Sequence, residues 1–149
     1  MTYNLGVEHY RSAHTVYLLR YHVVWVCKYR RRILKPGVIA SLERMLPTML
    51  DAFPGASLER IGFDRDHLHM VMLIPPKYAI SDVMRSLKSR SYSALRAEFP
   101  WIVNASRGRK KVVWSPGFYV SSVGANKATI AKYVADQGKR DSGQEKLDL

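Results

Sequence analysis

The chain has 149 residues, with 24 Lys and Arg against 12 Asp and Glu, a formal net charge of +12. This excess favours a polyanionic partner such as nucleic acid, because neutralising phosphates releases counterions; a merely basic protein is the alternative. No apolar stretch approaches the length of a membrane span, and residues 1–15 lack the apolar core of a signal peptide. The single Cys27 excludes an intrachain disulfide, so we expect one domain in a reducing cytoplasm.

The first half of the chain predicts strand, helix, strand and strand. Residues 15–28 are rich in β-branched and aromatic side chains and lack Gly and Pro, which predicts one long strand after an unstructured N-terminal extension, 1–14. Apolar residues recur at helical spacing from 37 to 53, and we expect a bend at Pro47. Residues 56–63 and 67–74 predict a hairpin of two strands, which Pro75-Pro76 ends.

The second half predicts helix, strand and helix. Ser81 is a plausible N-cap for a helix that runs to about Phe99, before Pro100. Residues 112–114 and 117–122 form the fourth strand region. The last helix is expected over 126–137, with Gly138 just beyond its end. The domain therefore spans 15–137, and residues 138–149 form a polar tail that we expect to be disordered.

The order β-α-β-β-α-β indicates an α+β, ferredoxin-like antiparallel sheet with an added C-terminal helix. The strand over 67–74 is apolar on both faces, whereas a sheet covered on one side only would alternate more cleanly. The C-terminal helix is the available cover for the second face, and there it would bring Tyr133 towards His67 and His69.

The candidate chemistry lies in His67, His69, Tyr133 and Gln137. The two histidines are two apart on a strand and therefore share a face, although strand histidines are more often ordinary hydrogen-bonded residues. Tyr133 and Gln137 are four apart on a helix and also share a face. Two imidazoles and an amide oxygen can hold a divalent cation, expected to be Mg²⁺ with Mn²⁺ as a substitute. A phenol beside such a site can attack phosphorus, which predicts nucleic-acid cleavage with Tyr133 as nucleophile.

Two basic runs, residues 28–32 and 107–111, adjoin predicted strands. A loop at the end of a strand can bind a nucleic-acid backbone. Solvated faces are the alternative interpretation of both runs. The helix that starts near Ser81 adds two further cations on its outer face. The expected DNA contacts are Lys28, Arg30, Arg31, Arg32, Arg85, Lys88, Arg107, Arg109, Lys110 and Lys111.

Four blocks in this order resemble the small single-tyrosine HUH transposases of bacterial insertion sequences, the TnpA type. The blocks are residues 21–32, residues 66–69 with 74–76, residues 114–124 and residues 133–137. The resemblance extends over about 15–137. It implies a sheet-sharing homodimer in which one subunit gives the histidines and the other the tyrosine helix. It also implies recognition of hairpins in single-stranded DNA, cleavage through a 5′-phosphotyrosine, and strand rejoining without ATP.

Other functions stay open on the sequence. A non-catalytic RNA- or DNA-binding module has the same order of elements, but such modules stack bases on aromatics of a central strand, and residues 67–74 contain none. A replication-initiation or relaxase-type HUH nuclease shares the chemistry in a chain that is usually longer. A domesticated HUH nuclease acting on dispersed palindromes is a further alternative.

Overall fold

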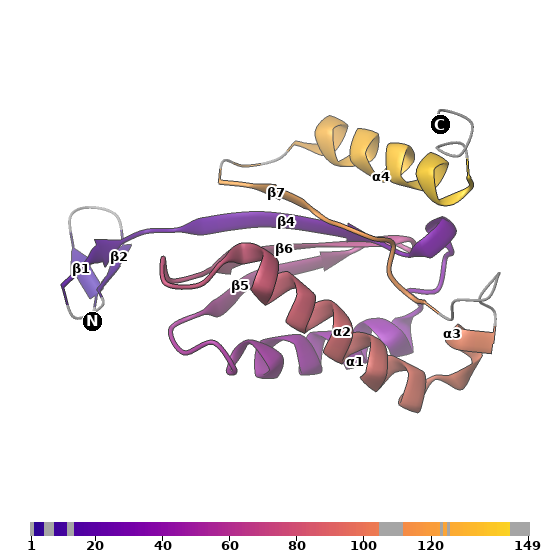
Figure 1. Ribbon diagram of the computed structural model, residues 1–149, viewed down its shortest axis with the longest axis horizontal. Helices are drawn as coiled ribbons and strands as arrows, with labels where there is room; N and C mark the ends of the chain where they lie inside the picture. The colour runs from indigo at the N-terminus through magenta and orange to yellow at the C-terminus, as the bar shows by residue number, and fades with distance from the viewer. Residues whose placement is uncertain are drawn as a thin grey trace.

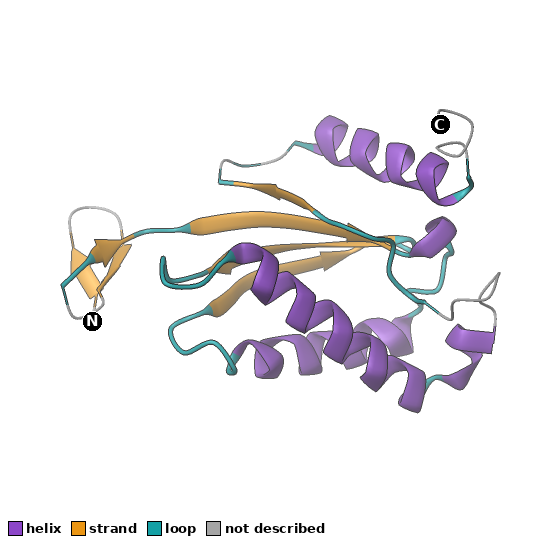
Figure 2. Ribbon diagram, in the orientation of Figure 1, coloured by secondary structure: helices purple, strands orange, loops and turns teal. Residues whose placement is uncertain are grey.

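The computed structural model describes residues 2–4, 8–11, 14–104, 112–122, 124 and 126–143. Its centre is a four-stranded antiparallel sheet in the order β5-β6-β4-β7, which confirms the predicted α+β class. The strands are β4 (Arg20–Val26), β5 (Ser57–Phe63), β6 (His67–Leu73) and β7 (Tyr119–Ser121). Helices α1 (Pro36–Leu50) and α2 (Ile80–Glu98) cover one face, and α4 (Lys127–Asp141) lies over the other (Figures 1 and 2).

The main core lies between the sheet and the helices α1 and α2. Alternate residues of β6, Leu68, Met70 and Met72, are buried there, and Trp25 of β4 joins them. Every second side chain of a strand points to the same face. The register between β4 and β6 therefore directs apolar side chains of both strands into this core. Each fully buried Leu or Met contributes about 1.5–3 kcal/mol, which makes this face the main source of stability.

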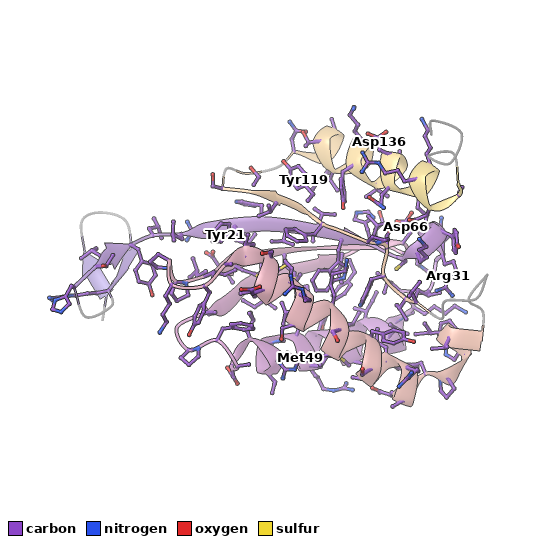
Figure 3. All side chains as sticks on the ribbon, viewed as in Figure 1. Tyr21, Arg31, Met49, Asp66, Tyr119 and Asp136 are labelled. Atoms are coloured by element: carbon purple, nitrogen blue, oxygen red, sulfur yellow. The ribbon has the colours of Figure 1, made fainter. Side chains whose placement is uncertain are left out.

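The second face of the sheet carries a smaller apolar cluster beneath α4. In the register of β4 and β6, Val24 lies opposite His69 and Val26 opposite His67. Val24 also faces Tyr119 of β7, and both valines pack with Val134 of α4. Figure 3 places Tyr119 in the layer between the sheet and α4. The C-terminal helix therefore covers the second face, as the apolar pattern of residues 67–74 predicted.

The N-terminal part of the chain differs from the sequence prediction. The long strand expected over 15–28 is interrupted at residues 18–19, because its two parts pair with different partners. β3 (Val16–Tyr17) pairs with β2 (Glu8–Arg11), which pairs with β1 (Thr2–Asn4), in a separate three-stranded sheet. This small sheet extends beyond one end of the main sheet (Figure 1), so the N-terminal extension contains regular structure.

Three other predicted boundaries are also wrong. α1 ends at Leu50 rather than Phe53, although Pro47 is accommodated within it. Ala79 is the N-cap of α2 and makes no side-chain capping bond, so Ser81 is inside the helix. The fourth strand is shorter than expected: within residues 112–114, Trp114 forms only an isolated bridge with Cys27. A short helix that the sequence did not predict, α3 (Pro100–Asn104), follows α2.

The last helix is longer than its sequence suggested. α4 continues through Gly138 to Asp141, so residues 138–141 of the predicted tail are helical, while 144–149 lie outside the described residues. Gly138 is buried, and a β-carbon there would collide with the side chain of Arg30. Gly138 therefore allows the side chain of Arg30 to pack closely against α4, and it does not end the helix. Among the helices that the structure describes, none combines the length and apolarity that crossing a bilayer requires.

We expect Gly62→Ala to displace the His69 imidazole. The two residues are cross-strand neighbours, and a β-carbon at position 62 would overlap ring atoms of His69. Since His69 is exposed, the ring can swing outwards, so the free energy of unfolding should change by less than about 1 kcal/mol. NMR signals of the His69 ring and thermal unfolding test this. Gly37→Ala is the control, because a β-carbon there meets Phe99 at an ordinary 3.8 Å; unmoved His69 signals in Gly62→Ala would contradict the prediction.

Candidate functional site

His67 and His69 line one cleft between β6 and the first turns of α4. The cleft has a volume of about 390 Å³, and both imidazoles face it, as their spacing on a strand predicted. Asp64 lies beside them, and Lys127, Ile130 and Ala131 close the cleft from α4. The C-terminal helix of the same subunit thus forms one wall of the histidine site.

Asp66 orients the ring of His67. The Nδ1 atom of His67 is 2.8 Å from one carboxylate oxygen of Asp66, and Nε of Arg30 donates to the other at 3.1 Å. Burial raises the pKa of Asp66, but the hydrogen bonds from His67 and Arg30 outweigh it and leave the pKa below its usual value. An ionised carboxylate can only accept, so Nδ1 of His67 donates to it, and in the neutral imidazole this leaves the lone pair of Nε2 for a ligand.

His69 is also suited to bind a cation. Partial burial of the ring lowers the pKa of His69, and the neighbouring His67 lowers it further, against an opposing effect of Asp64. The imidazole is therefore neutral at neutral pH, the form that ligates a metal. Two imidazoles in one cleft can bind a divalent cation. Among the described residues, no three His, Cys, Asp or Glu side chains are grouped so that they could hold one together.

Tyr133 lies on the same face of the sheet as the histidines. Its ring packs in the apolar cluster beneath α4, with its centroid 5.8 Å from that of Tyr119 at an interplanar angle of 51°. Burial raises the pKa of Tyr133 and Asp141 adds to this, whereas Arg140 opposes it. The phenol is thus protonated at neutral pH, and it must lose its proton before or during any attack.

The hydrogen bonds described for Gln137 are with Ser115 and Asp141. Gln137 is buried, and its Nε2 donates to Oγ of Ser115 at 2.7 Å and to Asp141 at 3.4 Å. Ser115 bonds through its backbone to Val26 on one side of β4, whereas His67 pairs with Val26 on the other. Two strand spacings, about 10 Å, therefore separate the backbones of Ser115 and His67. In this arrangement the amide of Gln137 is held beside Ser115, which neighbours β4 on the side opposite to His67.

The described cations among the predicted DNA contacts fall into two groups. Arg31 donates to the backbone carbonyls of Lys28, Ile102 and Val112 at 3.3, 2.9 and 2.9 Å. Lys88 donates to the carbonyls of Ser115 and Gly117, both at 2.7 Å, and burial lowers its pKa to about 8 against an opposing effect of Asp141. Lys28 contacts Asp141 at 3.4 Å. The second group, Arg30, Arg32 and Arg85, is exposed, while Arg107, Arg109, Lys110 and Lys111 lie outside the described residues.

A second cleft, of about 470 Å³, adjoins the histidine site and is basic. It lies between α4 and the 3₁₀ helix η1 (Lys28–Arg30), where Tyr29 and Arg30 have the positive φ angles 60° and 51°. Such backbone is uncommon for residues other than glycine and clusters at functional sites. The residues that line it are Tyr29, Arg30, Arg32, Asp66, Ala135, Gly138, Lys139 and Ser142.

Sequence reasoning assigned no role to Asp66 or Asp141. Asp66 directly precedes His67, and that adjacency was a usable signal for an orienting carboxylate. Asp141 is four residues after Gln137 and therefore on the same helix face, but ending the helix at Gly138 concealed this relation. Ser115, which bonds both Gln137 and Asp141, lies in the corner before β7, and no local sequence pattern marks it.

Comparisons with known proteins agree on one group. The family model "Transposase IS200 like" matches residues 15–137. The transposase for insertion sequence element IS200 of Salmonella typhimurium is 32% identical over 140 residues, which cover 92% of this chain and 88% of the relative. The ISDra2 transposase TnpA of Deinococcus radiodurans is 29% identical over 143 residues, covering 95% and 100%.

Two solved structures share the fold. A candidate transposase from Deinococcus radiodurans R1 superposes with a TM-score of 0.75 at 24% identity, covering 86% of this chain and 97% of that one. A REP-associated tyrosine transposase bound to a REP hairpin gives 0.51 at 16% identity, covering 83% and 68%. The match to the family model over most of the chain, together with the Salmonella relative, shows that this protein belongs to the IS200-like transposase family.

Proposed function

We propose that the protein is a metal-dependent transposase that cleaves single-stranded DNA through a covalent link to Tyr133 and then rejoins strands. One observation carries the proposal: the histidine pair and Tyr133 lie on the same face of the sheet, between the sheet and α4. Two imidazoles and a phenol are the groups that such chemistry needs. Family membership supports the transposase function itself.

The reaction that we propose exchanges one phosphodiester for another. The oxygen of Tyr133 forms a bond to phosphorus while the bond to the 3′ oxygen breaks. The leaving 3′ oxygen takes up a proton, and the phenol gives one up, so charge and atoms balance. The product is a 5′-phosphotyrosine beside a free 3′-hydroxyl, and attack by another 3′-hydroxyl reverses the step without ATP.

The histidines would hold the divalent metal, Mg²⁺ or Mn²⁺. Nε2 of His67 is the available ligand atom, since Nδ1 is engaged by Asp66. When bound, the metal would offer positive charge to polarise the scissile phosphate. Gln137 is the third ligand that we propose, and reaching the histidines would require its side chain to leave Ser115.

The proposed substrate is a hairpin in single-stranded DNA. The charge of +12 supports a nucleic-acid partner, and the related tyrosine transposase was solved with a REP hairpin bound. The basic cleft between η1 and α4 would carry the strand to the site, because it opens beside Asp66 and contains the cations Arg30, Arg32 and Lys139.

Tyr133→Phe tests the proposed nucleophile. The change removes one hydroxyl, so folding and DNA binding should persist while the covalent adduct falls at least roughly 1,000-fold. The measurement is a gel assay of protein incubated with labelled single-stranded hairpin DNA and Mn²⁺. Tyr119→Phe is the matched control, because Tyr119 is the aromatic neighbour of Tyr133 in the same layer. Loss of adduct only in Tyr119→Phe would move the nucleophile to that residue.

Arg32→Ala and Arg31→Ala should act on different properties. Arg32 is exposed in the basic cleft, so its loss should weaken binding to all hairpins alike and lower the salt slope by about 1. Arg31 bonds three backbone carbonyls, so its loss should lower the free energy of unfolding by about 2–3 kcal/mol. Salt titration of DNA binding measures the effect of Arg32→Ala, and denaturant unfolding measures the effect of Arg31→Ala. An Arg31→Ala protein of normal stability would refute the structural role of Arg31.

We further propose a homodimer whose composite sites join the histidines of one subunit to the tyrosine helix of the other. In this structure α4 lies on its own sheet, so exchange would have to move it. The connection before α4 supports such movement, because Gly124 is exposed and a side chain there would meet no atom within 4 Å. β7 is an edge strand of the main sheet, which makes it available for pairing with a second subunit.

Mixing two inactive variants tests the shared site. In a mixed dimer of Tyr133→Phe and His67→Ala subunits, one composite site would contain intact histidines and an intact tyrosine. After random exchange of subunits, about half of the dimers are mixed, and one of the two sites in each mixed dimer is intact. Cleavage should therefore recover to roughly a quarter of the wild-type level. No recovery after proven subunit exchange would show that each tyrosine helix serves its own subunit.

A further inference from the structure

The C-terminal end of α4 is fastened by the buried carboxylate of Asp141, whose side chain is only 2% exposed. Oγ of Ser115 lies 2.7 Å from both of its oxygens, and the backbone N–H of Tyr29 donates to it at 3.0 Å. Nζ of Lys28 and Nε2 of Gln137 each approach it at 3.4 Å. These five residues, which we call the Asp141 clasp, join η1, the corner before β7 and α4.

An acidic side chain is electrostatically unfavourable at this position. The C-terminal end of a helix carries partial negative charge, so a carboxylate there is repelled, and burial adds a further cost. Asp141 is therefore held by the donors that surround it. The clasp is also supported from the opposite side, since Lys88 of α2 donates to the carbonyl of Ser115.

The clasp determines where the amide of Gln137 lies. Ser115 has one hydroxyl proton, and the ionised carboxylate of Asp141 can only accept it. The oxygen of Ser115 is then left to accept from Nε2 of Gln137, at 2.7 Å. Because Gln137 and Asp141 are four residues apart on α4, one serine hydroxyl bridges both side chains.

We propose that the Asp141 clasp keeps Gln137 away from His67 and His69, and that its opening releases this amide to complete the metal site. Asp141 is then a positioning residue for the third ligand. With the clasp closed, Gln137 stays bonded to Ser115 and does not ligate a cation at the two imidazoles. This inference rests on the proposed metal site, because it concerns which ligands that site has.

Asp141→Asn tests the clasp against a matched control. The amide still fits the space but no longer attracts Lys28, and its nitrogen cannot accept a hydrogen bond. Asp136→Asn removes the same charge from the same helix, where Asp136 forms an exposed pair with Lys132 at 3.5 Å and points away from the sheet (Figure 3). By calorimetry, Asp141→Asn should bind Mn²⁺ roughly tenfold more tightly than Asp136→Asn. Hydrogen exchange over 137–143 should also be faster.

Ser115→Ala is the second variant, and it keeps the carboxylate and its pair with Lys28 while removing the bridge to Gln137. It should also raise Mn²⁺ affinity, and adding Gln137→Ala should cancel the gain in both variants. A purely structural role would produce no gain to cancel. Affinities of Asp141→Asn and Ser115→Ala no higher than that of Asp136→Asn would overturn the proposal.

His67→Ala, measured in parallel, separates this proposal from the proposed metal site. If His67→Ala abolishes Mn²⁺ binding while Asp141→Asn brings no gain, the metal site stands and the clasp proposal is wrong. If His67→Ala leaves Mn²⁺ affinity unchanged, the histidine site is wrong, and the clasp proposal is rejected with it.

Discussion

The register between β4 and β6 is the constraint on which both the core and the candidate site depend. It puts Leu68, Met70 and Met72 into the core and turns His67 and His69 to the opposite face. A slip by one residue would expose the apolar set and bury the histidines, so the hydrophobic effect itself holds the imidazoles in place. The site therefore needs no separate scaffold, because the side chains that stabilise the sheet also set the direction of the histidines.

The sequence predicted what depends on local periodicity. The strand over 67–74, the shared face of the two histidines and the helix cover on both sides of the sheet all follow from alternation and apolar spacing. It did not predict contacts between distant segments. Gly138 looked like a helix end because glycine usually marks one, but here it permits the close approach of Arg30, which lies more than a hundred positions earlier.

The positive charge of the chain also has more than one use. Arg31 and Arg32 are neighbours in one basic run, yet one bonds three backbone carbonyls and the other is exposed in the basic cleft. Composition could not separate them, because the difference depends on residues 102 and 112 folding back beside η1. Arginine suits such a junction, since its planar group offers several donors in fixed directions. The basic run over residues 28–32 of this chain therefore contains both a cation that binds the fold together, Arg31, and an exposed one, Arg32.

The helices on the two faces of the sheet are attached to it by apolar clusters of very different size, and this difference affects how the proposed reaction could proceed. Among the described residues, twenty buried side chains form the cluster on the α1 and α2 side, against three beneath α4. Detaching α4 would expose little apolar surface, so it should open at lower cost than α1 or α2. Tyr133 and Gln137 thus lie on the helix with the smallest apolar attachment to the sheet, and the polar contacts of Asp141 weigh more there than they would in the main core. The proposed nucleophile, Tyr133, would therefore reach a DNA strand more readily from α4 than from a helix packed in the main core.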